Sequence, residues 1–96
     1  MPSGTAGNRA IVTVIGEDRV GIIAGVATLL ADAQVNILDI SQSIMQEFFV
    51  MIMMVDLAAS RLGFDDLKHA LGTKGAQMSL KIDIQREDVF KLMHRV

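Results

Sequence analysis

The residues around Gly21 and Asn36 are of types that bind small zwitterions. Gly21 follows a turn and opens a predicted helix, where free backbone N–H groups and the helix dipole favour a carboxylate. Asp18, in the same turn, can accept a hydrogen bond from an ammonium group, and the Asn36 amide offers both a donor and an acceptor. Together the three residues could hold an α-amino acid. They are also ordinary turn residues, and on pattern alone that structural role is favoured.

No other residues have the spacing of a catalytic or cofactor site. The two histidines have no partner at metal-ligand spacing, cysteine is absent, and the glycines at 16, 21 and 25 match no nucleotide-binding motif. Each pair of adjacent acids precedes or opens a predicted helix, so the helix dipole accounts for it. The residues concerned are His69, His94, Glu17-Asp18, Asp65-Asp66 and Glu87-Asp88. We therefore expect no catalytic residue, no metal site, no cofactor and no enzymatic activity.

The composition indicates one domain that has more apolar residues than its own core needs. Hydrophobic residues make up 51% of the 96 residues and eight glycines add to them, above the usual total of about 45–50%. The longest apolar run, residues 48–55, is far shorter than the roughly 20 residues of a spanning helix. A net charge of −2 argues against a nucleic-acid partner, and residues 1–8 do not resemble a signal peptide. We expect a cytoplasmic protein that binds neither membrane nor nucleic acid.

The hydrophobic pattern predicts six main elements and a short helix at the end. Residues 10–15 read as a covered strand that stops at Gly16, and apolar residues from Ile22 recur at helical spacing for about 12 residues. Residues 35–45 and 48–57 read as two strands joined at Gln46-Glu47, the second apolar on both faces. A second helix begins near residue 64 and ends near residue 71 or 76, because its glycines disfavour a helix interior. A half-polar strand over residues 78–85 and a short helix over residues 87–95 follow.

This βαββαβ order predicts the α+β fold class. The expected architecture is a ferredoxin-like sandwich, with a four-stranded antiparallel sheet, two helices on one face and a short C-terminal helix. We divide the chain into a flexible N-terminal tail (residues 1–8), the domain itself (residues 9–86) and a C-terminal helical extension (residues 87–96).

The same turn, helix and strand start carry a family resemblance. Residues 18–31, DRVGIIAGVATLLA, followed by Val35-Asn36-Ile37, resemble the signature of the ACT domain, a regulatory amino-acid-binding module, and the likeness covers roughly residues 9–86. Residues 48–56 and 85–95 look like those of a bacterial group of stand-alone ACT proteins. The resemblance implies an effector site, commonly at a subunit interface, formed by the residues at matching positions. These are Asp18, Val20, Gly21, Ile22, Asn36 and Ile37.

One position departs from the family. Many members have Pro where this chain has Val20, and without the fixed φ of proline the turn is less pre-organised for a ligand.

Two surfaces could pair subunits. The first hairpin strand, residues 35–45, should lie at a sheet edge, and side-by-side pairing of two such edges would give an eight-stranded sheet with each Asn36 near the partner. The rival is the Met-rich sheet face. We expect a homodimer, or a higher oligomer, that senses an amino acid or similar small carboxylate and signals to a partner protein. The alternative is a structural domain that only assembles.

Overall fold

The computed structural model describes residues 8–93 and contains the predicted order of elements. Along the chain these are β1 (Arg9–Glu17), α1 (Ile22–Asp32), β2 (Asn36–Met45), β3 (Phe48–Asp56), α2 (Phe64–Met78), β4 (Leu80–Arg86) and α3 (Glu87–Met93). Residues 1–7 of the predicted tail and residues 94–96 of the predicted extension, with His94, lie outside the described part. No helix within it is long and apolar enough to cross a membrane.

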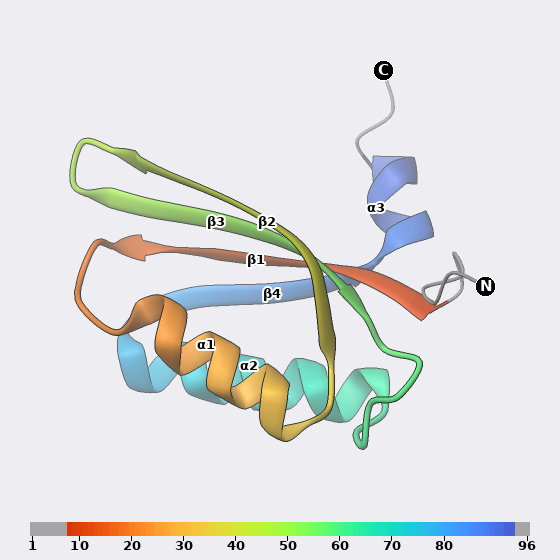
Figure 1. Cartoon of the computed structure of the whole chain (residues 1–96). Helices are drawn as coiled ribbons and strands as arrows, with labels where there is room; N and C mark the ends of the chain where they lie inside the picture. The colour runs from red at the N-terminus through yellow and green to blue at the C-terminus, as the bar shows by residue number, and fades with distance from the viewer. Residues whose placement is uncertain (1–7, 94–96) are drawn as a thin grey trace.

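The four strands form one sheet in the order β2-β3-β1-β4, and every neighbouring pair is antiparallel. Helices α1 and α2 lie against one face, whereas α3 lies on the opposite side (Figure 1). The ferredoxin-like α+β prediction is confirmed. Since β2 and β4 are the outer strands, β1 lies inside the sheet, which agrees with the apolar residues on both of its faces.

The hydrophobic core fills the space between the sheet and the two long helices. Alternate residues of β1 and β3 point into it, as the period of two in a strand requires, and they meet side chains spaced three or four apart on the helices. The fully buried members include Val12, Val14, Met51, Met53, Val55, Ile22, Val26, Leu30, Leu67, Leu71 and Ile84. The other face of β3 is also apolar, as predicted, but is not covered in the same way.

Several boundaries differ from the sequence-based expectations by one or two residues; β4, for example, begins at Leu80 and not at residue 78, which belongs to α2. Strand β1 continues past Gly16 to Glu17, because Gly16 and Glu17 still pair with Phe49 and Phe48 of β3. Helix α2 continues past both glycines to Met78, since packing against β4 outweighs their low helix propensity. It ends at Ser79, whose φ of 57° lies in the left-handed region.

Helix α3 is tied to the start of β1 by an ion pair. The guanidinium of Arg9 donates to both carboxylate oxygens of Glu87, from Nε at 3.0 Å and from Nη2 at 2.7 Å. Glu87 is 3% exposed, and the Lys91 ammonium lies 3.9 Å from the same carboxylate. Such a bidentate pair fixes orientation as well as position, so α3 is anchored at the end of the sheet where β1 begins.

Candidate functional site

The turn between β1 and α1 presents backbone donors at the surface. Gly21 is the N-cap of α1 with φ 93°, and no side chain caps the helix there. The first intrahelical bond runs from the Gly25 N–H to the Gly21 carbonyl oxygen (2.8 Å), so the N–H groups between them precede the helical bonding pattern. The Asp18 N–H donates to the Glu47 carbonyl oxygen (3.0 Å), which holds the turn against the tip of the β2–β3 hairpin.

The side chains named from the sequence occupy different environments. Asp18 and Gly21 are exposed, and Val20 is 99% exposed. Ile22 is 2% exposed and belongs to the core, so that residue offers a ligand its backbone N–H and not its side chain. Ile37 is half-buried against the same core.

Asn36 lies at the opposite end of the sheet from the Gly21 turn. Asn36 and Arg9 both pair with Asp56, whereas the other end of β1, Glu17, pairs with Phe48. The eight residue steps of β1 between these points, at about 3.3 Å each, correspond to about 26 Å. Asp18, Gly21 and Asn36 therefore do not line one pocket within a single chain, and the expectation that they jointly hold an amino acid fails for one chain alone.

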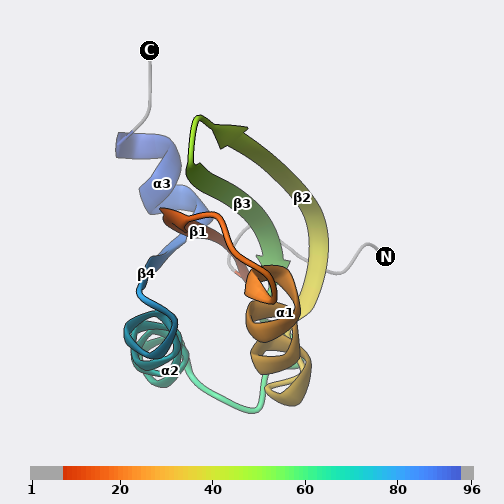
Figure 2. The same cartoon turned by 90° about the vertical axis from the view of Figure 1, so that its left-hand side faces the viewer.

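Strand β2 carries an apolar surface that the helices do not cover. Ile40 and Ile44 pair with Met53 and Phe49 and so project from the helix side of the sheet. Met53 and Phe49 are 1% and 5% exposed, but Ile40 and Ile44 are 43% and 59% exposed. Figure 2 shows the cause, because α1 and α2 lie side by side below the sheet while β2 curves away at its margin. We call Ile40, Ile44 and the outer backbone edge of β2 the β2 edge surface.

Two local features modify this edge. The Ile40 N–H donates to the carboxylate of Asp39 (2.9 Å), so it is already satisfied within the strand. The register with β3 shifts between Ile37 and Asp39, and such irregularities limit unwanted pairing of edge strands. Residues 35–45 were expected to form a pairing edge, but Asp39, Ile40 and Ile44 were not singled out within it. The sequence did contain a signal for them, because the strand over residues 35–45 has almost no charged residue and the predicted topology placed it at a sheet edge.

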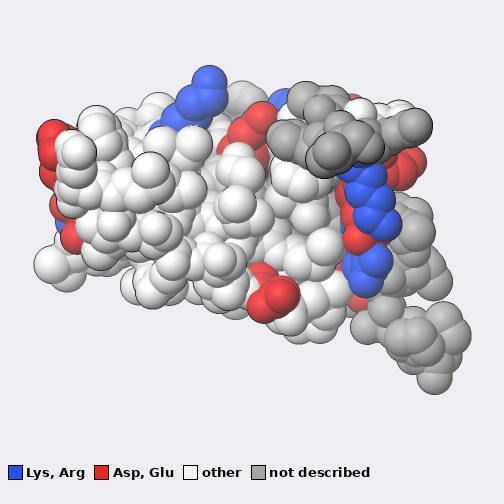
Figure 3. Space-filling view, turned by 90° about the horizontal axis from the view of Figure 1, so that it is seen from above, with Lys and Arg blue, Asp and Glu red and all other residues white. Residues whose placement is uncertain are grey.

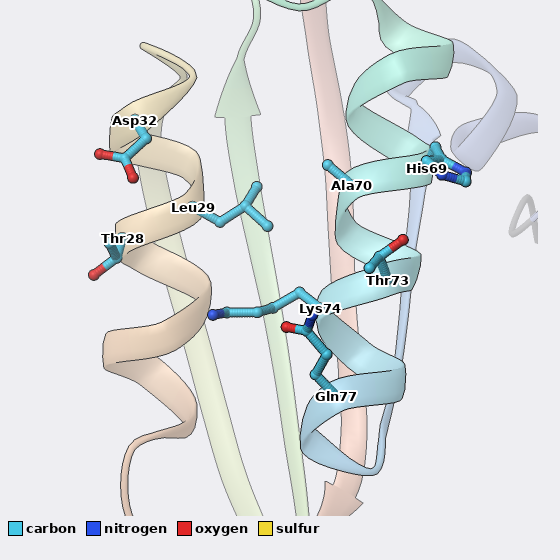
Figure 4. A pocket seen from close by; sticks show the side chains of 8 residues that line it. All are labelled: Thr28, Leu29, Asp32, His69, Ala70, Thr73, Lys74 and Gln77. Atoms are coloured by element: carbon cyan, nitrogen blue, oxygen red, sulfur yellow. The ribbon is translucent and has the colours of Figure 1, made fainter.

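A shallow groove of about 500 Å³ runs between α1 and α2, on the side away from the sheet. Lys74 extends across it toward α1, whereas His69 points away from α1 (Figure 4). Its walls mix one ammonium, the carboxylate of Asp32 and two threonine hydroxyls. None of its lining residues comes from the Gly21 turn or from β2. Across residues 8–93, no three His, Cys, Asp or Glu side chains gather as a metal site.

The fold defines a small ferredoxin-like α+β domain with an exposed turn at Gly21, and comparison with known proteins identifies its family. A family model described as "ACT domain" matches residues 8–85, so the chain belongs to the ACT domain family. Within that family it is similar to UPF0237 proteins. The one from Clostridium acetobutylicum is 54% identical over 88 residues, which cover 92% of this chain and 99% of the relative. The one from Methanocaldococcus jannaschii is 46% identical over 89 residues, 93% of this chain and 99% of the relative.

A solved structure supports the same conclusion. An ACT domain protein from Streptococcus pneumoniae is 35% identical and superposes with a TM-score of 0.78, covering 88% of this chain and 96% of that one. The family is typically one of small regulatory modules.

Proposed function

We propose that this chain is an amino-acid-binding regulatory module that works as a homodimer joined through β2. Each ligand lies between the Gly21 turn of one subunit and Asn36 of the partner subunit. The observation that carries the proposal is the position of Asn36, about 26 Å from the turn by the length of β1. A site that uses both residues requires two chains.

Pairing through β2 supplies the required geometry. Two β2 edges related by a two-fold axis run antiparallel, so the start of one strand lies beside the end of the other. The end of β2 is at the hairpin, and Glu47 of that hairpin is hydrogen-bonded to Asp18. Asn36 of the partner subunit thereby comes to the end of the sheet that carries the Gly21 turn.

The surfaces around β2 suit such a dimer. Ile40 and Ile44 are large, apolar and exposed, and Ile23 on α1 is 41% exposed. Strand β2 contains one charged residue, Asp39, and α1 contains one, Asp32. A second copy would bury apolar area with little desolvation of charge.

The groups that would surround the ligand match an amino acid. Backbone N–H groups in the first turn of α1, at the positive end of the helix dipole, suit the carboxylate. The carboxylate of Asp18 is exposed in the same turn and suits the ammonium group. The amide of Asn36 from the partner adds a donor and an acceptor, while Val20, 99% exposed, is free to contact the ligand side chain or the partner.

Calorimetric titration with the twenty amino acids tests binding, and mixed variants test the shared site. Asn36→Ala and Asp18→Ala should each weaken binding by about 1.5–3 kcal/mol, the range for hydrogen bonds to charged groups. In a heterodimer of the two variants, one site combines both intact residues and the other lacks both. Mixing should therefore restore one strong site per heterodimer, whereas a site within one chain predicts no recovery.

The alternative is an assembly domain without a ligand, which the substitution of Val20 for the frequent proline favours. A stable dimer whose melting temperature no amino acid changes at millimolar concentration would select that alternative.

A further inference from the structure

The face of the sheet opposite α1 and α2, here called the open face, is unevenly covered. Ile11 and Ile15 project from it on the same strand, four residues apart, yet Ile11 is 6% exposed and Ile15 is 47% exposed. Helix α3 contacts β1 and β4 at the end where β1 starts, and it stands above the sheet there (Figure 1). The open face thus has one half under α3 and one uncovered half toward the hairpin.

The uncovered half is largely apolar, with two exposed charged residues, Glu17 and Lys81, at its rim. Phe48 and Ile52 of β3, Ile15 of β1 and Met45 of β2 project from it, and they are 48%, 43%, 47% and 63% exposed. Figure 3 looks onto this face and shows a broad area without charged side chains on the side away from α3. Contiguous apolar area of this kind on a small domain marks an interaction surface.

Helix α3 has an apolar outer side as well. Val89 is 43% exposed and Leu92 is 67% exposed, although the helix is held in place through the buried Glu87. Within residues 8–93, Leu92 stays mostly uncovered, whereas Val89 is about half covered and borders a groove beside Phe64 of α2. The chain therefore carries a raised apolar element at one end of the open face and an uncovered apolar surface at the other.

We propose that the open face is a self-interface, in which two copies pair face to face and α3 of each copy lies on the uncovered half of the other. Consider a two-fold axis that lies parallel to the sheet and perpendicular to its strands. Rotation about this axis turns the open face of one copy toward the open face of the other and reverses the direction of the strands. This rotation places α3 of each copy over the uncovered half of the other copy. Because the complementary shape is already present on the chain, a second copy is the occupant that the geometry fits.

Two charges at the rim, Lys81 and Asp88, agree with this arrangement, whereas exposed Glu17 beside Phe48 carries the same sign as Asp88. Lys81 of β4 pairs with Ile15, so it projects from the uncovered half of the open face, where it is exposed. Asp88, in the first turn of α3, is exposed too. The two-fold operation brings the start of α3 over the hairpin half of β4, where Asp88 of one copy approaches Lys81 of the other. Opposite charges meet at the edge of the interface, and the centre is apolar, as in stable interfaces.

This self-interface is separate from the β2 edge surface, which uses the outer backbone edge of the sheet with Ile40 and Ile44. The two contacts can therefore coexist. With both in use, four copies form a closed assembly in which each copy has one edge partner and one face partner.

Sedimentation velocity and light scattering on the full chain test the proposal. Ile52→Arg places a charge in the uncovered half, and Leu92→Arg places one on the outer side of α3; both positions are exposed, so folding should be retained and is checked by circular dichroism. Each variant should halve the mass of the wild-type assembly. Ile40→Arg, the matched control on the β2 edge surface, should leave the face contact intact, and the double variant Ile40→Arg/Ile52→Arg should be monomeric.

A charge exchange provides the decisive comparison. Lys81→Glu should weaken the face contact, and Lys81→Glu combined with Asp88→Lys should restore it. If neither Ile52→Arg nor Leu92→Arg changes the mass, the open face is not a self-interface and the proposal is wrong. Ligand binding separates this result from the proposed function, because binding should be lost in Ile40→Arg and retained in Ile52→Arg.

Discussion

Gly72 and Gly75, three residues apart in α2, should respond to alanine with opposite signs. An ideal Cβ at Gly72 meets nothing within 4 Å, and the residue is exposed. At Gly75 the same atom lies 2.7 Å from the carbonyl oxygen of Leu80 and 3.2 Å from Cγ1 of Ile82. Since the closest atom belongs to the backbone of β4, it cannot turn away as a side chain would.

The magnitudes follow from these contacts. Gly72→Ala gains helix propensity without a clash and should raise the free energy of unfolding by about 0.5–1 kcal/mol. Gly75→Ala gains the same propensity but pushes α2 away from β4, and overpacking in a core costs about 1–3 kcal/mol. The two variants should therefore differ by about 2 kcal/mol. In a domain of this size, 1 kcal/mol shifts Tm by about 4–8 °C.

Urea unfolding and thermal melting at one fixed protein concentration are suitable assays, because association would otherwise shift both curves. Each variant serves as the control for the other, since the substitution and the helix are the same. If Gly75→Ala stabilises the protein as much as Gly72→Ala does, the close approach of α2 to Leu80 does not constrain the helix, and the reasoning fails.

Three further predictions follow. Arg9→Met should lower the free energy of unfolding in urea by about 3 kcal/mol, because it leaves the buried carboxylate of Glu87 without its guanidinium partner. The double variant Arg9→Met/Glu87→Leu should recover much of that loss. If the single and double variants lose the same free energy, the buried charge is not the cause. Gly21→Ala should cost about 1–2 kcal/mol in thermal unfolding, because a φ of 93° strains a residue with a Cβ; Gly21→Asn should cost less, and no loss in either variant would argue against strain. Asp39→Ala frees the outer N–H of Ile40 to bond across the β2 edge, worth about 0.5–1.5 kcal/mol. Because both copies carry the change, it should tighten the dimer by about 5- to 150-fold in dilution experiments, and weaker association would refute a competing role for Asp39.

Much of the fold follows from local patterns. In β3 the alternation of Phe48 and Ile52 with Phe49 and Met53 predicted a strand apolar on both faces, and the turn after Met45 fell where the polarity was highest. These features depend on neighbouring residues alone. The element order, and with it the sheet order, could be inferred because few topologies connect such elements.

Features that depend on register were not predictable. The β1–α1–β2 crossover already places Gly21 and Asn36 at opposite ends of the sheet, but their distance depends on which residues of β1, β3 and β2 face one another, and no local pattern gives that pairing. The extent of α2 depended on the contact between Gly75 and β4, which overrides helix propensity. The ion pair between Arg9 and Glu87 joins residues 78 positions apart, and two isolated charged residues in a sequence give no sign of it.

The central place of β1 also governs how the chain reaches its fold. Strand β1 has β3 on one side and β4 on the other, and its first residue is held by Glu87. One side of β1 can pair with β3 once residue 56 has left the ribosome, but its other side stays without a partner until β4 has followed. We expect a single cooperative folding step, with the millisecond-scale rates typical of such non-local topologies. Chains cut short before β4 should expose one side of β1 and aggregate.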